Sequence, residues 1–170
     1  MKQPINLAAI CSEYLRFRNS QQSLQIATIS VEGLPEASYA PFVWFEDACY
    51  LFLSQLARHT QNLNSNAAIG LLLIEDEAAA ANQFARRRII FQGKSSIVAR
   101  HVELYQTVMQ QFRNRFGHFI DTIEPLQDFQ LFKVVPLSGR FIRGFAQAFE
   151  LSGDGLNKIM PVNPAQNSTR

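Results

Sequence analysis

Three side chains that can bind an anion lie close together in the sequence, at Ser54, Arg58 and His59. They fall where a predicted strand ends and a predicted helix begins. Backbone N–H groups at the start of a helix lack partners, and the helix dipole favours negative charge there. The hydroxyl, guanidinium and imidazole groups can each donate a hydrogen bond. The segment is therefore a candidate site for a phosphate or carboxylate; the alternative is a capped surface helix with two exposed basic residues.

A second basic cluster, Arg86-Arg87-Arg88, enters a predicted strand. Side chains alternate across a strand, so Arg86 and Arg88 would share one face and Arg87 would lie on the other. Two guanidinium groups on one face can clamp a phosphate or carboxylate. The alternative is that these arginines solubilise a sheet edge, or pair with the acidic residues 75–77.

A third polar set lies toward the end of the sequence, at Asp128, Arg140, Arg143 and Gln147. Asp128 could orient a histidine, cap a helix or face solvent, and capping is the commonest of these roles. No nucleophile–base pair, carboxylate dyad or glycine-rich phosphate loop is recognisable in the sequence. Any enzymatic activity would therefore depend on a cofactor that supplies the reactivity.

The elements that must position these residues follow from hydrophobic periodicity. Alternating or continuous apolar stretches predict strands at residues 24–31, 37–44, 49–53, 67–74, 86–98, 129–135 and 140–151. Helical spacing predicts an N-terminal helix within residues 1–20 and further helices at 58–66, 78–81 and 100–116. Residues 155–170 are rich in Asn, Pro and Ser, which predicts a mobile tail.

These elements predict a mainly β fold with flanking helices, in a single domain over residues 1–170. Closing the strands into a barrel would remove exposed sheet edges. Side chains fill the narrow interior of a small barrel, so a large ligand would lie outside it, typically between two subunits. We therefore expect a homodimer with a site at the subunit interface. The 14 phenylalanines favour the same arrangement.

The composition excludes several classes of protein. A net charge of +2 is too small for a nucleic-acid-binding protein that must neutralise many phosphates. The first residues do not form a signal peptide, and no apolar run approaches the length of a membrane helix, so a cytoplasmic protein is expected. The two cysteines, Cys11 and Cys49, form no C-x-x-C pair, which argues against a zinc site and predicts buried free thiols.

The order of several motifs resembles that of the pyridoxamine 5′-phosphate oxidase-like, FMN-binding split-barrel superfamily. Within it, the sequence is most similar to the heme-utilisation branch, whose members bind heme and in some cases degrade it. The similarity extends from about residue 23 to residue 154. The motifs that carry it are Ser38-Tyr39-Ala40-Pro41-Phe42, residues 53–66, Ile74-Glu75-Asp76, residues 84–89, Leu126-Gln127-Asp128-Phe129 and residues 144–148.

The resemblance implies a split β-barrel and a set of cofactor-binding residues. Ser54, Arg58 and His59 lie where flavin-binding members hold the FMN phosphate, with His59 at a position where lysine is usual. Residues 39–42 match a segment that runs along the flavin, and Arg88 is best placed on its strand to reach an anionic group. The complete implied set is Tyr39, Ala40, Pro41, Phe42, Ser54, Arg58, His59, Arg88 and Asp128.

The resemblance also exposes a departure from the heme branch. There, Asp128 matches an acidic residue that supports an iron-ligating histidine from the tail of the neighbouring subunit. In the heme branch, that histidine lies a few residues after the turn that matches residues 152–154. This sequence has Pro161 at about that position, and no histidine follows His118. The expected cofactor is thus FMN or heme, with no identified metal ligand. The sequence leaves three functions open: a heme-binding protein with or without heme-degrading activity, an FMN-dependent oxidoreductase, or a non-catalytic carrier or cofactor-free dimer.

Overall fold

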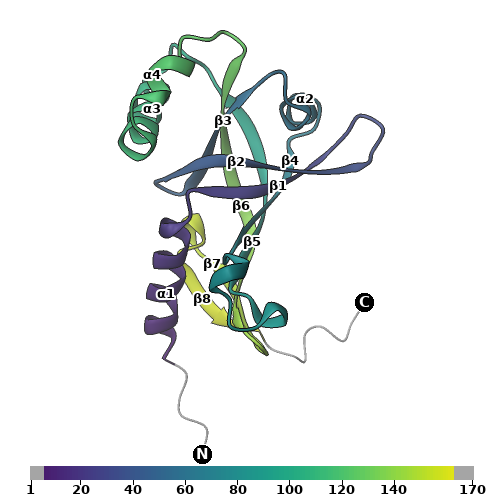
Figure 1. Ribbon diagram of the computed structural model, residues 1–170, viewed down its shortest axis with the longest axis vertical. Coiled ribbons are helices and arrows are strands. Elements are labelled where there is room, and N and C mark those ends of the chain that lie inside the picture. Colours follow the sequence, from purple (N-terminus) through teal and green to yellow (C-terminus); the bar gives the residue numbers. More distant parts are fainter. Residues whose placement is uncertain (1–5, 163–170) are drawn as a thin grey trace, which may run out of the picture.

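The computed structural model describes residues 6–162 and consists of one eight-stranded sheet with flanking helices (Figure 1). The strands are β1 Ser23–Ile29, β2 Pro35–Phe45, β3 Ala48–Ser54, β4 Ala68–Ile74, β5 Arg88–Val98, β6 Phe129–Gly144, β7 Gln147–Ser152 and β8 Lys158–Pro161. The helices are α1 Leu7–Ser20, α2 Arg58–Ser65, α3 Glu103–Phe116 and α4 Phe119–Ile123, with short 3-10 turns η1 Glu77–Ala79, η2 Gln83–Ala85 and η3 Asp154–Leu156.

The first six strands of the sheet close into a barrel. The strand order is β3-β2-β1-β4-β5-β6-β7-β8, and β3 also pairs with β6. This last pairing joins Cys49 to Val134 and Ser54 to Phe129. The predicted mainly β fold with flanking helices is therefore confirmed, as is the predicted split barrel.

Side chains fill the barrel interior because alternate residues of its strands point inward. In β1 every second residue is buried, and β4 alternates between more and less exposed positions in the same way. One continuous hydrophobic cluster includes Leu24, Ile26, Phe42, Leu51, Leu71, Phe91, Phe132 and Phe141. Three residues of α1 join this cluster, so α1 closes one end of the barrel: Ile10, Tyr14 and Phe17. A packed interior leaves the outer surface as the place for a large ligand.

A second hydrophobic cluster lies outside the barrel, beneath α3 and α4. Tyr50 and Phe52 of β3 pack there against Tyr105 and Phe112 of α3. This explains why six of the seven residues in β3 are buried, since both of its faces are covered. The opposite outer face, on β1, β4 and β5, carries exposed residues such as Ile90.

The predicted boundaries of the last strands were wrong. Residues 129–135 and 140–151 were expected to be two strands, but β6 runs without interruption to Gly144 and a separate β7 begins at Gln147. Pro136 does not end the strand, because it pairs with Gly93 beside a shift of register, a position where a proline is tolerated. The turn between β6 and β7 contains Ala146 with a φ of 56°.

The segment predicted as a mobile tail from residue 155 begins with regular structure, and its mobility stays a prediction. Asp154 to Leu156 form η3, and β8 pairs antiparallel with β7. The side chain of Asn157 donates to Asp47 Oδ1 at 3.3 Å and accepts from Arg18 at 3.4 Å, which ties this segment to the barrel and to α1. The remainder of the predicted tail, residues 163–170, lies outside the described residues.

Candidate functional site

Barrel closure brings Ser54 and Asp128 together, because Ser54 is the last residue of β3 and Asp128 directly precedes β6. The Ser54 hydroxyl donates a 2.8 Å hydrogen bond to Asp128 Oδ2. The backbone N–H of Gln55 donates to the Asp128 carbonyl oxygen at 2.7 Å, and that of Leu56 donates to Ser54 Oγ at 3.2 Å. Since a hydroxyl has a single proton, Ser54 has none left to donate to a ligand in this arrangement. Asp128 acts neither as a helix cap nor as a free surface residue.

Arg58 begins α2, which follows Ala57 without a side-chain cap. Its guanidinium group forms a 3.0 Å ion pair with Glu36 Oε1 of β2, while 84% of its side chain stays exposed. Asn62 donates a 2.6 Å hydrogen bond to the other oxygen of the same carboxylate. Glu36 is therefore fixed from two directions, and it neutralises the positive charge of Arg58.

His59 is partly buried, unlike the exposed Arg58. Its Nδ1 lies 2.8 Å from Ser38 Oγ, and burial lowers the pKa of the imidazole below its ordinary value. The ring is therefore mostly neutral at neutral pH. It lines a pocket of about 310 Å³ together with Thr28, Glu36, Ala37, Ser38 and Arg58.

The balance of charge around this cluster differs from the one that the sequence suggested. Arg58 is its one cation, whereas Glu36 and Asp128 both contribute carboxylates and His59 is neutral. To accept a hydrogen bond from Ser54, a phosphate dianion would have to displace Asp128, and at Arg58 it would bind beside the Glu36 carboxylate. The assignment of Ser54, Arg58 and His59 as an anion site stays a prediction, and the geometry adds this condition to it.

The segment 39–42 divides its side chains between the two faces of β2. Ala40 and Phe42 are buried in the barrel core at 2% and 0% exposure, so their side chains cannot touch an external ligand. Tyr39 and Pro41 point outward, and 70% of Tyr39 is exposed. Only these two side chains of the segment are available to a ligand on the outer face.

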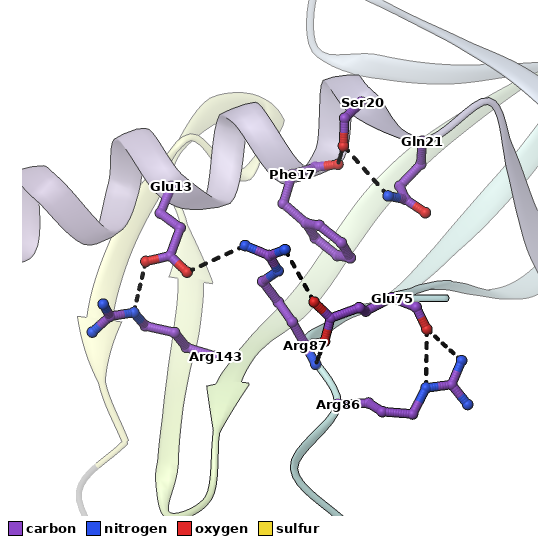
Figure 2. Close-up of polar contacts among 8 residues, drawn as sticks. All are labelled: Glu13, Phe17, Ser20, Gln21, Glu75, Arg86, Arg87 and Arg143. Atoms are coloured by element: carbon purple, nitrogen blue, oxygen red, sulfur yellow. Dashed lines mark hydrogen bonds and ion pairs between the residues drawn. The ribbon is translucent and has the colours of Figure 1, made fainter. Parts of the chain in front are cut away.

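Arg86 and Arg87 are engaged with acidic residues, as the alternative interpretation of this cluster predicted (Figure 2). Arg86 donates to the Glu75 carbonyl oxygen at 2.9 Å and pairs with Glu77 at 3.1 Å. Arg87 pairs with Glu75 at 3.2 Å and with Glu13 of α1 at 3.6 Å. Both arginines precede the start of β5, so the predicted alternation of faces does not apply to them.

Arg88 begins β5 and pairs with Ile74 of β4 and Ile142 of β6. Its guanidinium group donates to the Arg86 carbonyl oxygen at 3.0 Å. Within residues 6–162, no contact links it to Ser54, Arg58 or His59. The structure therefore does not bring Arg88 into the same cluster.

Two residues of the cluster were missing from the predicted set, Glu36 and Ser38. Both come from the face of β2 that turns toward α2, where Ser38 contacts His59 and Glu36 contacts Arg58. The strict alternation of β2 could have placed them together on one face, but their partners on α2 depend on the fold. Within the described residues, no group of three or more His, Cys, Asp or Glu side chains could hold a metal ion. None of the described helices is long and apolar enough to cross a membrane.

The fold and sequence together define the class of this protein. The sequence profile of the family described as pyridoxamine 5′-phosphate oxidase matches residues 11–143, and the chain belongs to this family. The superfamily predicted from the order of motifs is thus confirmed.

Individual relatives narrow the class further. The heme oxygenase HutZ of Vibrio cholerae is 42% identical over 144 residues, which cover 85% of this chain and 82% of HutZ. A crystal structure of HutZ, described as a heme storage protein, matches 74% of this chain and 88% of its own chain with a TM-score of 0.71 and 41% identity. Campylobacter jejuni ChuZ matches 99% of this chain and 68% of its own, with a TM-score of 0.86 and 27% identity. These matches confirm the similarity to the heme-utilisation branch.

Proposed function

We propose that this protein binds heme on the outside of the barrel and serves in heme utilisation. The observation that carries this proposal is the 42% identity to a heme oxygenase over 85% of the chain. Heme, once bound, would supply the redox chemistry, while the chain supplies binding and orientation. Breakdown of the bound heme is the finer form of the proposal, and it requires a reductant and dioxygen in addition.

Two of the predicted site residues have side chains that can ligate heme iron, and their environments fit that role. His59 is mostly neutral, which is the ligating form of imidazole, and Ser38 fixes its Nδ1. Tyr39 follows Ser38 in sequence but presents an exposed phenol on the opposite, outward face of β2. The position of the tail histidine in the heme branch holds Pro161, which ends β8 opposite Phe149 and offers no ligand.

We also propose that two copies of the chain pair through the outer face of β2, β1, β4, β5 and β6. In the register of the sheet, Tyr39 lies opposite Gln25, Gln25 opposite Leu72, and Leu72 opposite Ile90. Val135 extends the same face, since it pairs with Lys94, four residues from Ile90 on β5. Tyr39, Ile90 and Val135 are 70%, 39% and 44% exposed. An exposed apolar face of this kind fits a subunit interface, and Tyr39 would place a ligand there.

Hemin titration of the purified protein tests heme binding directly. We expect a saturable Soret band, which should shift or weaken in either His59→Gln or Tyr39→Phe. His118→Gln is the matched control, because that imidazole is fully exposed and Asp121 is its one polar partner among residues 6–162. Failure to saturate, or identical spectra for all three variants and the parent protein, would refute the assignment of these residues as ligands.

Light scattering tests the proposed homodimer. We expect a dimer, and Ile90→Glu should shift it toward monomer because the charge would lie in an apolar interface. Phe84→Glu is the control, since Phe84 is 91% exposed on η2, outside the face. A monomeric parent protein would exclude a site between subunits.

An FMN-dependent oxidoreductase is the second candidate, because the family match and the resemblance both allow a flavin. A flavin absorbance band in the purified protein, with no Soret band on hemin titration, would favour it. A protein that shows neither band would fit the third possibility, a non-catalytic carrier or cofactor-free dimer. For each of these three candidate functions, we propose that the protein acts in the cytoplasm.

A further inference from the structure

We propose that the groove between α1 and the β7–β8 hairpin is a second binding site, for a small apolar molecule that carries one carboxylate. The groove has a volume of about 630 Å³, within the usual range for small-molecule sites. Figure 1 shows α1, β7 and β8 at the opposite end of the molecule from α2 and its cluster. Within one chain, the groove therefore lies apart from the cluster at α2.

One face of α1 forms the first wall of the groove. Asn6, Ala9, Glu13 and Arg16 recur at the spacing that places helical residues on one side. Residues of the hairpin form the other wall and are mainly apolar, including Ala148, Phe149, Pro161 and Val162. The groove therefore combines an apolar lining with charged residues along α1.

The charged residues of the groove leave a net positive charge. Glu13 accepts a 2.6 Å hydrogen bond from Arg143 Nε and also pairs with Arg87 at 3.6 Å, so its carboxylate is already neutralised (Figure 2). Arg143 donates Nη1 to Gln147 at 3.3 Å, while its Nη2 has no partner among the described residues. Arg16 forms no ion pair or side-chain hydrogen bond within residues 6–162.

These unused donors define the class of ligand. A carboxylate fits the free edge of the Arg143 guanidinium and the charge of Arg16, because both can donate charge-assisted hydrogen bonds. The apolar part of the molecule would then lie along Ala148 and Pro161. Glu13, Arg16 and Arg143 together leave one positive charge in the groove, which matches a single carboxylate better than a dianion.

Isothermal titration calorimetry of the full-length protein with decanoate tests this site, with decanol as the uncharged comparison. We expect one saturable decanoate site per chain and weaker binding of decanol. Arg16→Gln and Arg143→Gln should each lower the decanoate affinity about three- to fivefold, the loss that corresponds to one partly exposed ion pair. Ala148→Phe should abolish binding by filling the groove. Arg140→Gln is the control and should bind as the parent protein does, since Arg140 pairs with Glu150 outside the groove.

Three results would overturn the proposal. They are the absence of saturable binding, equal affinities for decanol and decanoate, and unchanged affinity in Arg16→Gln together with Arg143→Gln. Arg16→Gln removes no described contact, so this variant should fold and remain informative even if Ala148→Phe does not. The titrations need no heme, and their outcome is independent of the hemin experiment.

Discussion

Removing the hydroxyl of Ser54 should lower the free energy of unfolding by about 1 kcal/mol, because the hydrogen bond to the Asp128 carboxylate is lost. Asp128→Ala should cost a similar amount, since it removes the same bond from the other side. If one interaction accounts for both losses, the double variant should cost little more than either single one. The two substitutions are therefore coupled rather than additive.

The magnitude follows from the geometry of the bond. A hydrogen bond to a charged group contributes about 1.5–3 kcal/mol when it is buried. Ser54 and Asp128 are only half-buried, so solvent competes for both groups and a coupling energy of about 1 kcal/mol is expected. The backbone bond from Gln55 to Asp128 is unaffected by either substitution and should keep the two segments together. The Leu56 N–H that loses Ser54 Oγ can bond to water instead.

Urea unfolding measured by the fluorescence of Trp44, the single tryptophan, provides the assay. Trp44 lies 5.2 Å from the Phe91 ring and 4.2 Å from the Arg18 guanidinium group, so its emission should report loss of the packed barrel. The four proteins of the cycle should unfold with equal m-values. A coupling energy below about 0.3 kcal/mol, the usual error of additivity, would show that Ser54 and Asp128 do not share this bond.

Three further predictions concern stability. Arg87→Met should lower the free energy of unfolding by about 1.5 kcal/mol, because it removes two ion pairs and a guanidinium 4.7 Å from the Phe17 ring. Arg140→Met should lower it by only about 0.5 kcal/mol in the same urea assay, and equal losses would contradict the prediction. Because burial lowers the pKa of His59, the unfolded chain binds more protons than the folded protein below about pH 6.5. The free energy of unfolding should therefore decrease as the pH falls through this range. His59→Gln should reduce that fall between about pH 7 and pH 5.5, whereas an unchanged urea midpoint profile would contradict it. Gly93→Ala should lower the free energy of unfolding by about 2 kcal/mol, since the added Cβ would lie 2.6 Å from a backbone oxygen of β6. A Cβ at Gly144 would have no neighbour within 4 Å, so Gly144→Ala should change this free energy by no more than about 0.5 kcal/mol, as measured by thermal unfolding.

The strands of the barrel could be predicted because one side of each faces the core and the other faces solvent. The alternation of apolar and polar residues at 24–31 corresponds to the alternate burial of β1, and the apolar run at 67–74 corresponds to β4. The turn between β6 and β7 could not be predicted in this way. Its positive φ falls on Ala146, a residue type that rarely adopts it, and apolar Phe145 next to it is 79% exposed.

Some members of the candidate site could be predicted, but Glu36, Ser38 and the contacts within the cluster could not. Ser54 and Asp128 were each chosen from sequence, yet their hydrogen bond depends on the register in which β3 meets β6. The partner of Arg58 depends similarly on how α2 packs against the barrel, which places Glu36 beside it. Local periodicity carries no information about such long-range register, so neither the contact of Asp128 with Ser54 nor that of Glu36 with Arg58 was expected.

Barrel closure by β3 and β6 also has a consequence for the kinetics of folding. The residues that pair there, from Cys49 with Val134 to Ser54 with Phe129, are far apart in the chain, whereas β1 to β3 form a local meander. Pairing of distant segments must overcome a larger loss of chain entropy before its contacts form. We therefore expect the meander to form early and the β3–β6 seam to form late. The contact between Ser54 and Asp128 at the end of this seam would then exist only in molecules that have completed the barrel.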